Sequence, residues 1–346
     1  MSSKSLRSTS TEPDGERDIY SIIEQRIEPM GGAYKGVYAP VGFLNKKKTG
    51  VGEFFLENAD EYHKRYFNLE DTKPAVKKAI QMSKKNYGNN PVILDLGSGT
   101  GNSVFSLVEI YPKATILATD ISPQMVTILG SIKNEYYPAA NIGLLAVDAL
   151  EITIEPGTVD IVSGCAFLHH CVYYEKMLDI TYKALNNNGV AIFLEPMMSI
   201  YIPMSAMLNT IIKMNGYITD DPLDSKVIKH FQAFIRQWKT RIEAMEHNDY
   251  KKVKDYDDKW FFSREKLTRL ADSIGFKKCL ISPMYETDRK KPVKYITEMR
   301  GILHLIDLKY ECLPTWARDI VETFDRSDFS PNHNDLAANG IIVLLK

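Results

Sequence analysis

Short apolar runs alternate with segments of helical spacing along residues 91–196. Little polar alternation occurs within the runs, so both faces of each strand are expected to be buried, as in a parallel sheet. The runs are Val92–Leu96, Thr115–Thr119, Ile142–Val147, Thr158–Gly164 and Val190–Leu194. Repeated strand and helix predict an α/β fold with right-handed crossovers.

The pattern divides the remaining chain. The expected parts are a disordered tail (1–17), a mostly helical cap segment (18–90), the core (91–196), a helical insertion or lid (197–260), and the rest of the core (261–346) with an insertion at about 285–335. Expected helices include Ile19–Ile27, Lys73–Asn86, Tyr173–Asn187, Val227–Glu246 and Tyr295–Leu308. Asn188-Gly189 is expected to end the third of these, and the charged run Lys251–Lys259 predicts a solvated link.

A glycine-rich turn follows the first strand of the core. It reads Gly97-Ser98-Gly99-Thr100-Gly101, and a helix is expected directly after it. Strand, glycine turn and helix together bring backbone close to a nucleotide-like ligand. A dinucleotide fingerprint would need a glycine at position 102, where this chain has Asn102. The acidic Asp95 would sit badly beside a pyrophosphate and well beside a cationic amino-acid ligand.

An acidic residue followed by G-x-G-x-G resembles the first motif of the class I S-adenosylmethionine-dependent methyltransferases, small-molecule type. The resemblance covers roughly Val92–Pro196 in ordered motifs. It implies a Rossmann-like methyltransferase fold, a mostly parallel seven-stranded sheet with helices on both faces and a helical cap. S-adenosyl-L-methionine is the implied cofactor. The implied binding residues of the turn are Asp95, Gly97, Ser98, Gly99, Gly101 and Asn102.

Two further segments extend the implied cofactor site. Asp120 follows the second strand, where an acidic residue binds ribose hydroxyls in such sheets. Ile121 and Met125 belong to a D-x-S-x-x-M segment that flanks the adenine in the family, with Ser122 expected to cap a helix. Asp148-Ala149 follows the third strand, where the family places an acidic residue against the adenine amino group. Asp148 as a simple turn cap is the alternative.

The fourth strand is followed by Cys165 and then by His169 and His170, where the methyl acceptor is expected. Cys165 is counted with the cofactor site. Either histidine is a candidate general base because its ordinary pKa lies near neutrality, and the sequence does not distinguish the two. Hydrogen bonding within the loop is the alternative role. The Asn/Asp-Pro-Pro-aromatic loop of base-methylating enzymes is not found at this place.

Segments outside the core motifs are expected to complete the pocket. Tyr62 and Tyr66 lie in a helix that in the family folds over the cofactor, although plain packing on the core is the alternative. The methionine-rich segment Met197–Met214 is either a substrate lid or a helical core or homodimer face. The insertion at about 285–335 is expected to add to the acceptor pocket wall.

The composition of the chain argues against several classes of binding partner. A net charge of −1 lacks the basic excess that nucleic-acid binding needs. Four cysteines without C-x-x-C spacing predict reduced thiols, and the dispersed histidines predict no metal site. The polar N-terminus lacks the apolar core of a signal peptide, and Met197–Met214 is too polar to span a membrane. A cytoplasmic location is therefore expected.

The leading hypothesis is an S-adenosylmethionine-dependent methyltransferase that acts on oxygen or carbon of a small metabolite. Methylation of a carrier-bound or macromolecular substrate is the alternative within the enzyme class. A catalytically silent relative that binds only the cofactor is the alternative outside it. A nicotinamide-dependent oxidoreductase is disfavoured by Asp95 and Asn102.

Overall fold

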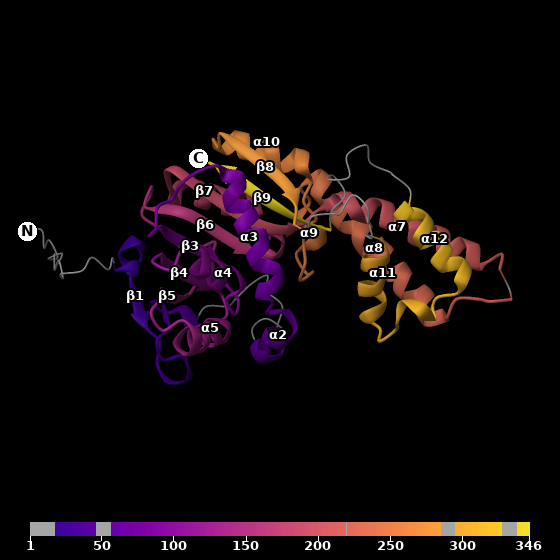
Figure 1. Cartoon of the computed structure of the whole chain (residues 1–346), viewed down its shortest axis with the longest axis horizontal. Coiled ribbons are helices and arrows are strands. Elements are labelled where there is room, and N and C mark those ends of the chain that lie inside the picture. Colours follow the sequence, from indigo (N-terminus) through magenta and orange to yellow (C-terminus); the bar gives the residue numbers. More distant parts are fainter. Residues whose placement is uncertain (1–17, 46–56, 219, 285–294, 327–337) are drawn as a thin grey trace, which may run out of the picture.

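A nine-stranded sheet forms the centre of the protein, with the strand order β1-β2-β5-β4-β3-β6-β7-β9-β8 (Figure 1). The computed structural model describes residues 18–45, 57–218, 220–284, 295–326 and 338–346. The strands are β1 (Ile27–Pro29), β2 (Tyr38–Pro40), β3 (Val92–Leu96), β4 (Thr115–Asp120), β5 (Asn141–Ala146), β6 (Val159–Cys165), β7 (Leu185–Pro196), β8 (Lys278–Pro283) and β9 (Asn339–Leu345). The α/β class expected from the sequence is confirmed.

The strand order places a crevice at one edge of the sheet. Strands β5, β4, β3, β6 and β7 are parallel, whereas β9 pairs antiparallel with both β7 and β8. The chain leaves β3 for β4 on one side and later returns to β6 on the other, so the strand order reverses at β3. Open α/β sheets bind ligands outside the carboxyl ends of the strands at such a reversal.

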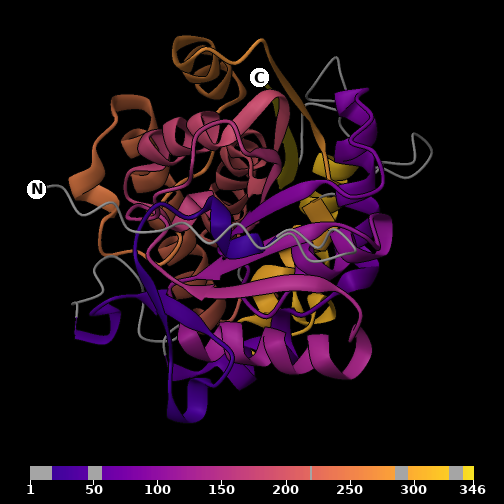
Figure 2. The same ribbon diagram turned by 90° about the vertical axis from the view of Figure 1, so that its left-hand side faces the viewer.

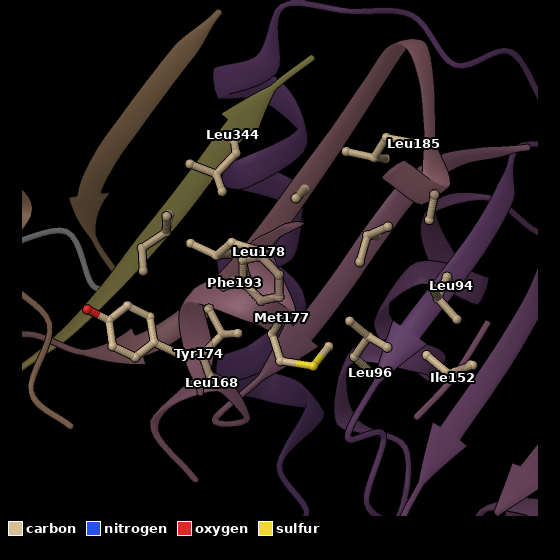
Figure 3. Packing of buried hydrophobic residues seen from close by; sticks show 14 of the residues in the cluster. Leu94, Leu96, Ile152, Leu168, Tyr174, Met177, Leu178, Leu185, Phe193 and Leu344 are labelled. Carbon is tan, nitrogen blue, oxygen red and sulfur yellow. The ribbon is translucent and has the colours of Figure 1, made fainter. Parts of the chain in front are cut away.

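Helices cover both faces of the sheet because neighbouring residues of each strand point to opposite sides. Ile93 belongs to the apolar cluster of one face, whereas Leu94 belongs to the cluster of the other face, which also contains Leu178 and Phe193 (Figure 3). Helices α3 (Leu69–Ser83), α4 (Asn102–Ile110) and α5 (Pro123–Tyr136) lie on the first face, and α6 (Tyr174–Ala184) and α10 (Arg264–Ile274) on the second. Figure 2 shows the sheet between them from the β1 side.

Several helix boundaries follow signals that are local in the sequence. Ser122 caps α5, because its side chain accepts a hydrogen bond from the Met125 N–H, and Pro123 opens the helix. Ser263 caps α10 in the same way, and Gly275 ends it in a left-handed conformation with φ of 113°. Helix α3 begins at Leu69, four residues earlier than expected, because Asn68 provides the cap.

A helical lobe packs beside the sheet (Figure 1). It consists of α7 (Met198–Asn215), α8 (Ser225–His247), α11 (Tyr295–His304) and α12 (Thr315–Arg326), with the short α9 (Tyr250–Val253) between α8 and the core. These four longer helices share a separate apolar core that includes Met204, Phe231, Trp238 and Met299. Among the described helices, none is long and apolar enough to cross a membrane.

The cap segment differs from its expectation. The helix expected at Ile19–Ile27 ends as a 3-10 turn, η1 (Ile19–Ile22), because Ile23 is extended and bridges to Ile154. Strands β1 and β2 then extend the sheet at β5, which gives nine strands in place of the expected seven. Helix α2 (Ala59–Tyr66) and the short turns η2 (Gly32–Tyr34) and η3 (Phe43–Asn45) complete this segment.

The expected helix Tyr173–Asn187 is also shorter. Helix α6 ends at Ala184, and β7 begins directly at Leu185, so Asn188-Gly189 lies within a strand and caps no helix. Asn186 donates a hydrogen bond to Asp160 Oδ1 at 2.6 Å, which ties the start of β7 to β6. Short turns also lie at η4 (Leu168–His170) and η5 (Tyr310–Cys312).

Candidate active site

The turn between β3 and α4 requires glycine at three positions, because side chains there would be strained or would clash. Gly97, Gly99 and Gly101 all have positive φ, at 61°, 52° and 110°. A Cβ atom on Gly97 would lie 2.2 Å from Cδ2 of Phe167, so a side chain at position 97 would displace the ring. The turn therefore brings bare backbone to the carboxyl edge of the sheet.

The Asp120 carboxylate at the end of β4 fixes this turn. Oδ2 accepts a hydrogen bond from the Gly99 N–H at 2.9 Å, and Oδ1 accepts one from the Ser122 N–H at 2.8 Å. The Ser98 N–H donates to the Thr119 carbonyl at 2.8 Å, and the Ser98 side chain is buried. The carboxylate thus joins the turn to the start of α5.

Asp95 lies beneath the turn and is fully buried. Its carboxylate accepts hydrogen bonds from the hydroxyls of Ser103, at 2.9 Å, and Ser163. Burial raises the pKa of Asp95 to about 6, against the lowering effect of these hydroxyls. Asp95 does not line the cavity described below, so its expected contact with a cationic ligand stays a prediction.

A cavity of about 410 Å³ opens above the turn. Its lining includes the expected residues Tyr62, Gly97, Gly99, Asp120, Ile121, Met125, Asp148, Ala149, Cys165 and His170. Asp148 accepts a hydrogen bond from the Leu150 N–H at 2.9 Å, as a turn cap does, and it also lines the cavity, so its contact with an adenine amino group stays a prediction. Burial raises the pKa of the Cys165 thiol to about 12, so this thiol is protonated at neutral pH.

Six of the expected residues do not line this cavity. They are Asp95, Ser98, Gly101, Asn102, Tyr66 and His169. Gly101 makes room for Phe105, because a Cβ there would lie 2.3 Å from that ring. Asn102 accepts a hydrogen bond from the Asn68 N–H at 2.8 Å and donates one to the Tyr66 carbonyl at 2.9 Å. Asn102 therefore attaches the cap segment to the turn.

Helix α2 lies over the glycine turn. Its His63 side chain is hydrogen-bonded to the Thr100 hydroxyl at 3.0 Å, and a Cβ on Gly99 would lie 3.7 Å from Tyr62 Cε1. Burial and the nearby Asp120 raise the pKa of the Tyr62 hydroxyl. Tyr66 contacts the Tyr62 ring at a centroid distance of 4.8 Å and is 45% exposed. Of the two tyrosines, only Tyr62 lines the cavity.

Residues 165–171, the cavity loop, follow β6. Glu195, at the end of β7, is 1% exposed and holds this loop. Its carboxylate accepts hydrogen bonds from the N–H groups of Phe167, Leu168 and His169 at 3.0, 2.7 and 3.3 Å. The same carboxylate bonds to His169 Nδ1 at 2.7 Å. The sequence places the acidic Glu195 at the end of a predicted strand, which is a signal for a functional position. It does not reveal that Glu195 contacts the cavity loop, because the two are distant in the sequence.

The two histidines have opposite environments. His169 Nε2 lies 3.5 Å from Asp258 Oδ1, so both ring nitrogens face carboxylates. Burial alone would lower the pKa of His169, but Asp258 and Glu195 outweigh it and raise the pKa to about 9. Burial and the neighbouring His169 lower the pKa of His170 to about 3. At neutral pH His169 is therefore charged and His170 neutral.

The contacts of His170 also assign its tautomer. Its Nδ1 lies 2.9 Å from the Asp257 carbonyl, which can only accept, so Nδ1 carries the hydrogen. The neutral ring then has its lone pair on Nε2. His170 lines the cavity and His169 does not.

Residues 254–260, the wall segment, close the cavity on the other side. Lys254, Asp255 and Asp257 are exposed, as expected for a solvated run, but they also line the cavity, so Lys251–Lys259 is more than a link. Lys259 is 1% exposed and donates to the Tyr256 carbonyl at 2.8 Å. The segment lacks any apolar period that would have revealed this role. Among the described residues, the cavity wall takes nothing from 295–326, contrary to the expectation for the late insertion.

One nitrogen of His169, one of His170 and one oxygen of Asp258 lie within 4.8 Å of one another. The dispersed histidines of the sequence did not predict this grouping. The ring contacts favour hydrogen bonding, because His169 faces two carboxylates and His170 Nδ1 faces a carbonyl. That the protein uses no metal stays a prediction.

The strand order, the glycine turn and the cavity at the carboxyl edge define a class I methyltransferase fold. Residues 93–189 match the methyltransferase domain family. Residues 93–189 therefore form a methyltransferase domain, and S-adenosyl-L-methionine is the cofactor of such domains with this fold.

One similar protein is the demethylmenaquinone methyltransferase of Thermus thermophilus, at 30% identity over 103 residues. The match spans 30% of this chain and 46% of that protein, so the chain spans about half the length of the curated relative it matches.

Two solved structures show a weaker likeness. One is phosphoethanolamine N-methyltransferase 2 of Haemonchus contortus in complex with S-adenosyl-L-methionine, with a TM-score of 0.43 and 14% identity over 78% of this chain and 52% of that one. The other is a SAM-dependent methyltransferase of Archaeoglobus fulgidus, with a TM-score of 0.45 and 14% identity over 84% and 100% of the two chains. The fold assignment rests on the strand order and the family match.

Proposed function

We propose that this protein transfers the methyl group of S-adenosyl-L-methionine to a nucleophilic oxygen or carbon of a small metabolite. The observation that carries the proposal is the cavity itself, in which the glycine turn, Asp120, Asp148 and His170 meet. The first three would hold the nucleoside part of the cofactor, and the last would meet the acceptor. The net charge of −1 supports a small acceptor over a nucleic acid.

Each group has a chemical role in this proposal. The Asp120 and Asp148 carboxylates would accept hydrogen bonds from the ribose hydroxyls and the adenine amino group. When bound, the sulfonium cofactor supplies a methyl carbon already activated for in-line displacement. The protein's main tasks are then to align the acceptor and to exclude water, and Tyr62 and Phe167 border the cavity for the second task.

An oxygen or carbon acceptor must also lose a proton. As the new bond to the methyl carbon forms, the acceptor proton would pass to His170 Nε2, which carries the lone pair of the neutral ring. Because the pKa of His170 is lowered to about 3, the ring is a weak base, so this role requires an acceptor whose own proton is acidic. The carbon–sulfur electron pair goes to sulfur, so charge is balanced and S-adenosyl-L-homocysteine is the second product. His170 thus takes the base role that the sequence left open between two histidines.

Incubation with S-adenosyl-L-methionine and a crude metabolite extract tests this function. We expect one metabolite to gain the mass of one methyl group, with S-adenosyl-L-homocysteine formed in equal amount. With that acceptor, His170→Ala should slow turnover by about 10²–10⁴-fold while cofactor affinity stays within a few-fold. Undiminished turnover in His170→Ala would remove the histidine from the mechanism. Absence of any methylated product would contradict the proposed function.

A further inference from the structure

A set of cross-contacts, the seam, joins the cavity loop to the wall segment. The Lys259 N–H donates to the His169 carbonyl at 2.8 Å, and the Trp260 indole N–H donates to the Cys171 carbonyl at 2.8 Å. His170 Nδ1 donates to the Asp257 carbonyl at 2.9 Å. Both sides of the cavity are therefore held at a distance that the seam sets.

His169 is the charged group at the centre of the seam. Glu195 Oε2 lies 2.7 Å from its Nδ1 on the core side, and Asp258 Oδ1 lies 3.5 Å from its Nε2 on the wall side. Glu195 is itself fixed by three backbone N–H groups, so the core side of this arrangement is rigid. On the wall side the ring faces the Asp258 carboxylate, which is half-exposed.

The same carboxylate extends the arrangement to the helical lobe. Arg241 of α8 places Nη2 4.0 Å from Asp258 Oδ2. The Arg241 guanidinium also lies over the rings of Tyr256 and Phe261, at 5.4 and 5.1 Å from their centroids. A continuous series of charges therefore runs from β7 through the cavity loop and the wall segment to α8.

We propose that His169 is a positioning residue: held between Glu195 and Asp258, it keeps the wall segment against the cavity loop and so sets where His170 meets the acceptor. The inference rests on the proposed function, because the place it sets is that of the methyl acceptor. His169 itself does not line the cavity, which separates its role from that of His170.

The arrangement has a direct consequence for pH. The groups that act on the His169 ring are Glu195 from β7, Asp258 from the wall segment and, as a neutral ring, His170. Arg241 from α8 pairs with the other oxygen of Asp258, and Lys259 contacts the His169 carbonyl through its backbone N–H. The two carboxylates favour the charged ring, so its attraction for the wall segment is full at neutral pH. It weakens as the pH rises through about 9, where His169 loses its proton.

Calorimetry with S-adenosyl-L-homocysteine between pH 7 and 10 tests the inference, with wild type and Asp258→Asn compared. We expect the wild-type affinity to fall about tenfold or more as the pH passes roughly 9. In Asp258→Asn one of the two carboxylates is gone, so the fall should begin about one pH unit lower. The amino group of the probe titrates identically in both proteins, so only the difference between them reports on His169.

Trp260 gives a second measurement that needs no bound probe. It is fully buried and donates across the seam, so its fluorescence should shift to longer wavelength when the seam opens. The pH at the midpoint of that shift should equal the pH at the midpoint of the affinity loss, in both wild type and Asp258→Asn. Asp258→Glu should restore the wild-type midpoint, at least in part. Glu243→Gln is the matched control, because this α8 carboxylate pairs with Lys252 away from the cavity, and it should keep the wild-type midpoint.

Equal midpoints for wild type and Asp258→Asn would overturn the inference and leave the proposed function standing. The same holds if affinity falls while the Trp260 emission stays constant. Failure of the wild type to bind S-adenosyl-L-homocysteine at any pH is a different result, which would contradict the proposed function itself.

Discussion

The Phe167 ring fills the space next to Gly97, although the two residues are 70 positions apart in the sequence. The ring takes the space that any side chain at position 97 would need, and φ of 61° at Gly97 is in the left-handed region. Both facts bear on ligand binding, because both residues line the cavity.

Gly97→Ala should therefore lower the affinity for S-adenosyl-L-methionine by about tenfold or more, since the ring of Phe167, which lines the cavity, must shift. Gly157→Ala is a matched control: Gly157 has a similar φ of 73° but nothing within 4 Å of the added atom. Both variants carry backbone strain of about 1–2 kcal/mol, so both should unfold at lower temperature. Calorimetry that found equal affinity in the two variants would contradict the role given to Gly97.

Single residues show how far a sequence pattern reaches. The positive φ values of the turn glycines could be predicted, because G-x-G-x-G after an apolar strand has few other uses. The burial of Asp95 under Ser103 and Ser163 could not, because Ser163 comes from a different strand. The difference between His169 and His170 could not either, since it depends on Glu195 and Asp258, which lie 26 and 89 positions away from His169 in the numbering.

Helix α2 is the element that closes the cavity from the N-terminal side. It is attached to the turn through His63 with Thr100 and through Asn102 with the Tyr66 carbonyl. These contacts place Tyr62 over Gly99 and leave Tyr66 half-exposed outside the cavity.

Tyr62→Ala should weaken binding of S-adenosyl-L-methionine by about tenfold, because it removes a ring that borders the cavity. Tyr66→Ala, one turn further along the same helix, should change the affinity by less than about threefold. Thermal unfolding of both variants checks that α2 remains folded. A larger loss in Tyr66→Ala than in Tyr62→Ala would show that the helix is packed differently.

Elements with local signals were predictable, and elements that depend on distant partners were not. Strands β3 to β6 and the capped helices α5 and α10 follow from apolar runs and from Ser122 and Ser263. Strands β1 and β2 have three residues each, too few for a period, and form only because β5 offers an edge. The early start of β7 depends on the contact between Asn186 and Asp160, which no local pattern encodes.

At the scale of the whole molecule, the cavity lies where the sheet reverses its order, and a chain segment far along in sequence closes it. The wall segment 254–260 precedes α10, and it reaches the cavity loop because α8 and α9 return the chain from the helical lobe to the sheet. The sequence predicts that the lobe is helical. It also predicts that the late insertion, at about 285–335, adds to the wall of the acceptor pocket. The described part of that insertion packs with α7 and α8 instead.

The central claim is that the cavity binds a sulfonium nucleoside amino acid, and the most direct test is calorimetry of the purified protein with S-adenosyl-L-methionine and with NAD. The account predicts saturable binding of S-adenosyl-L-methionine at about one molecule per chain, with no heat from NAD, because Asn102 replaces the third fingerprint glycine. Binding of NAD alone would contradict it.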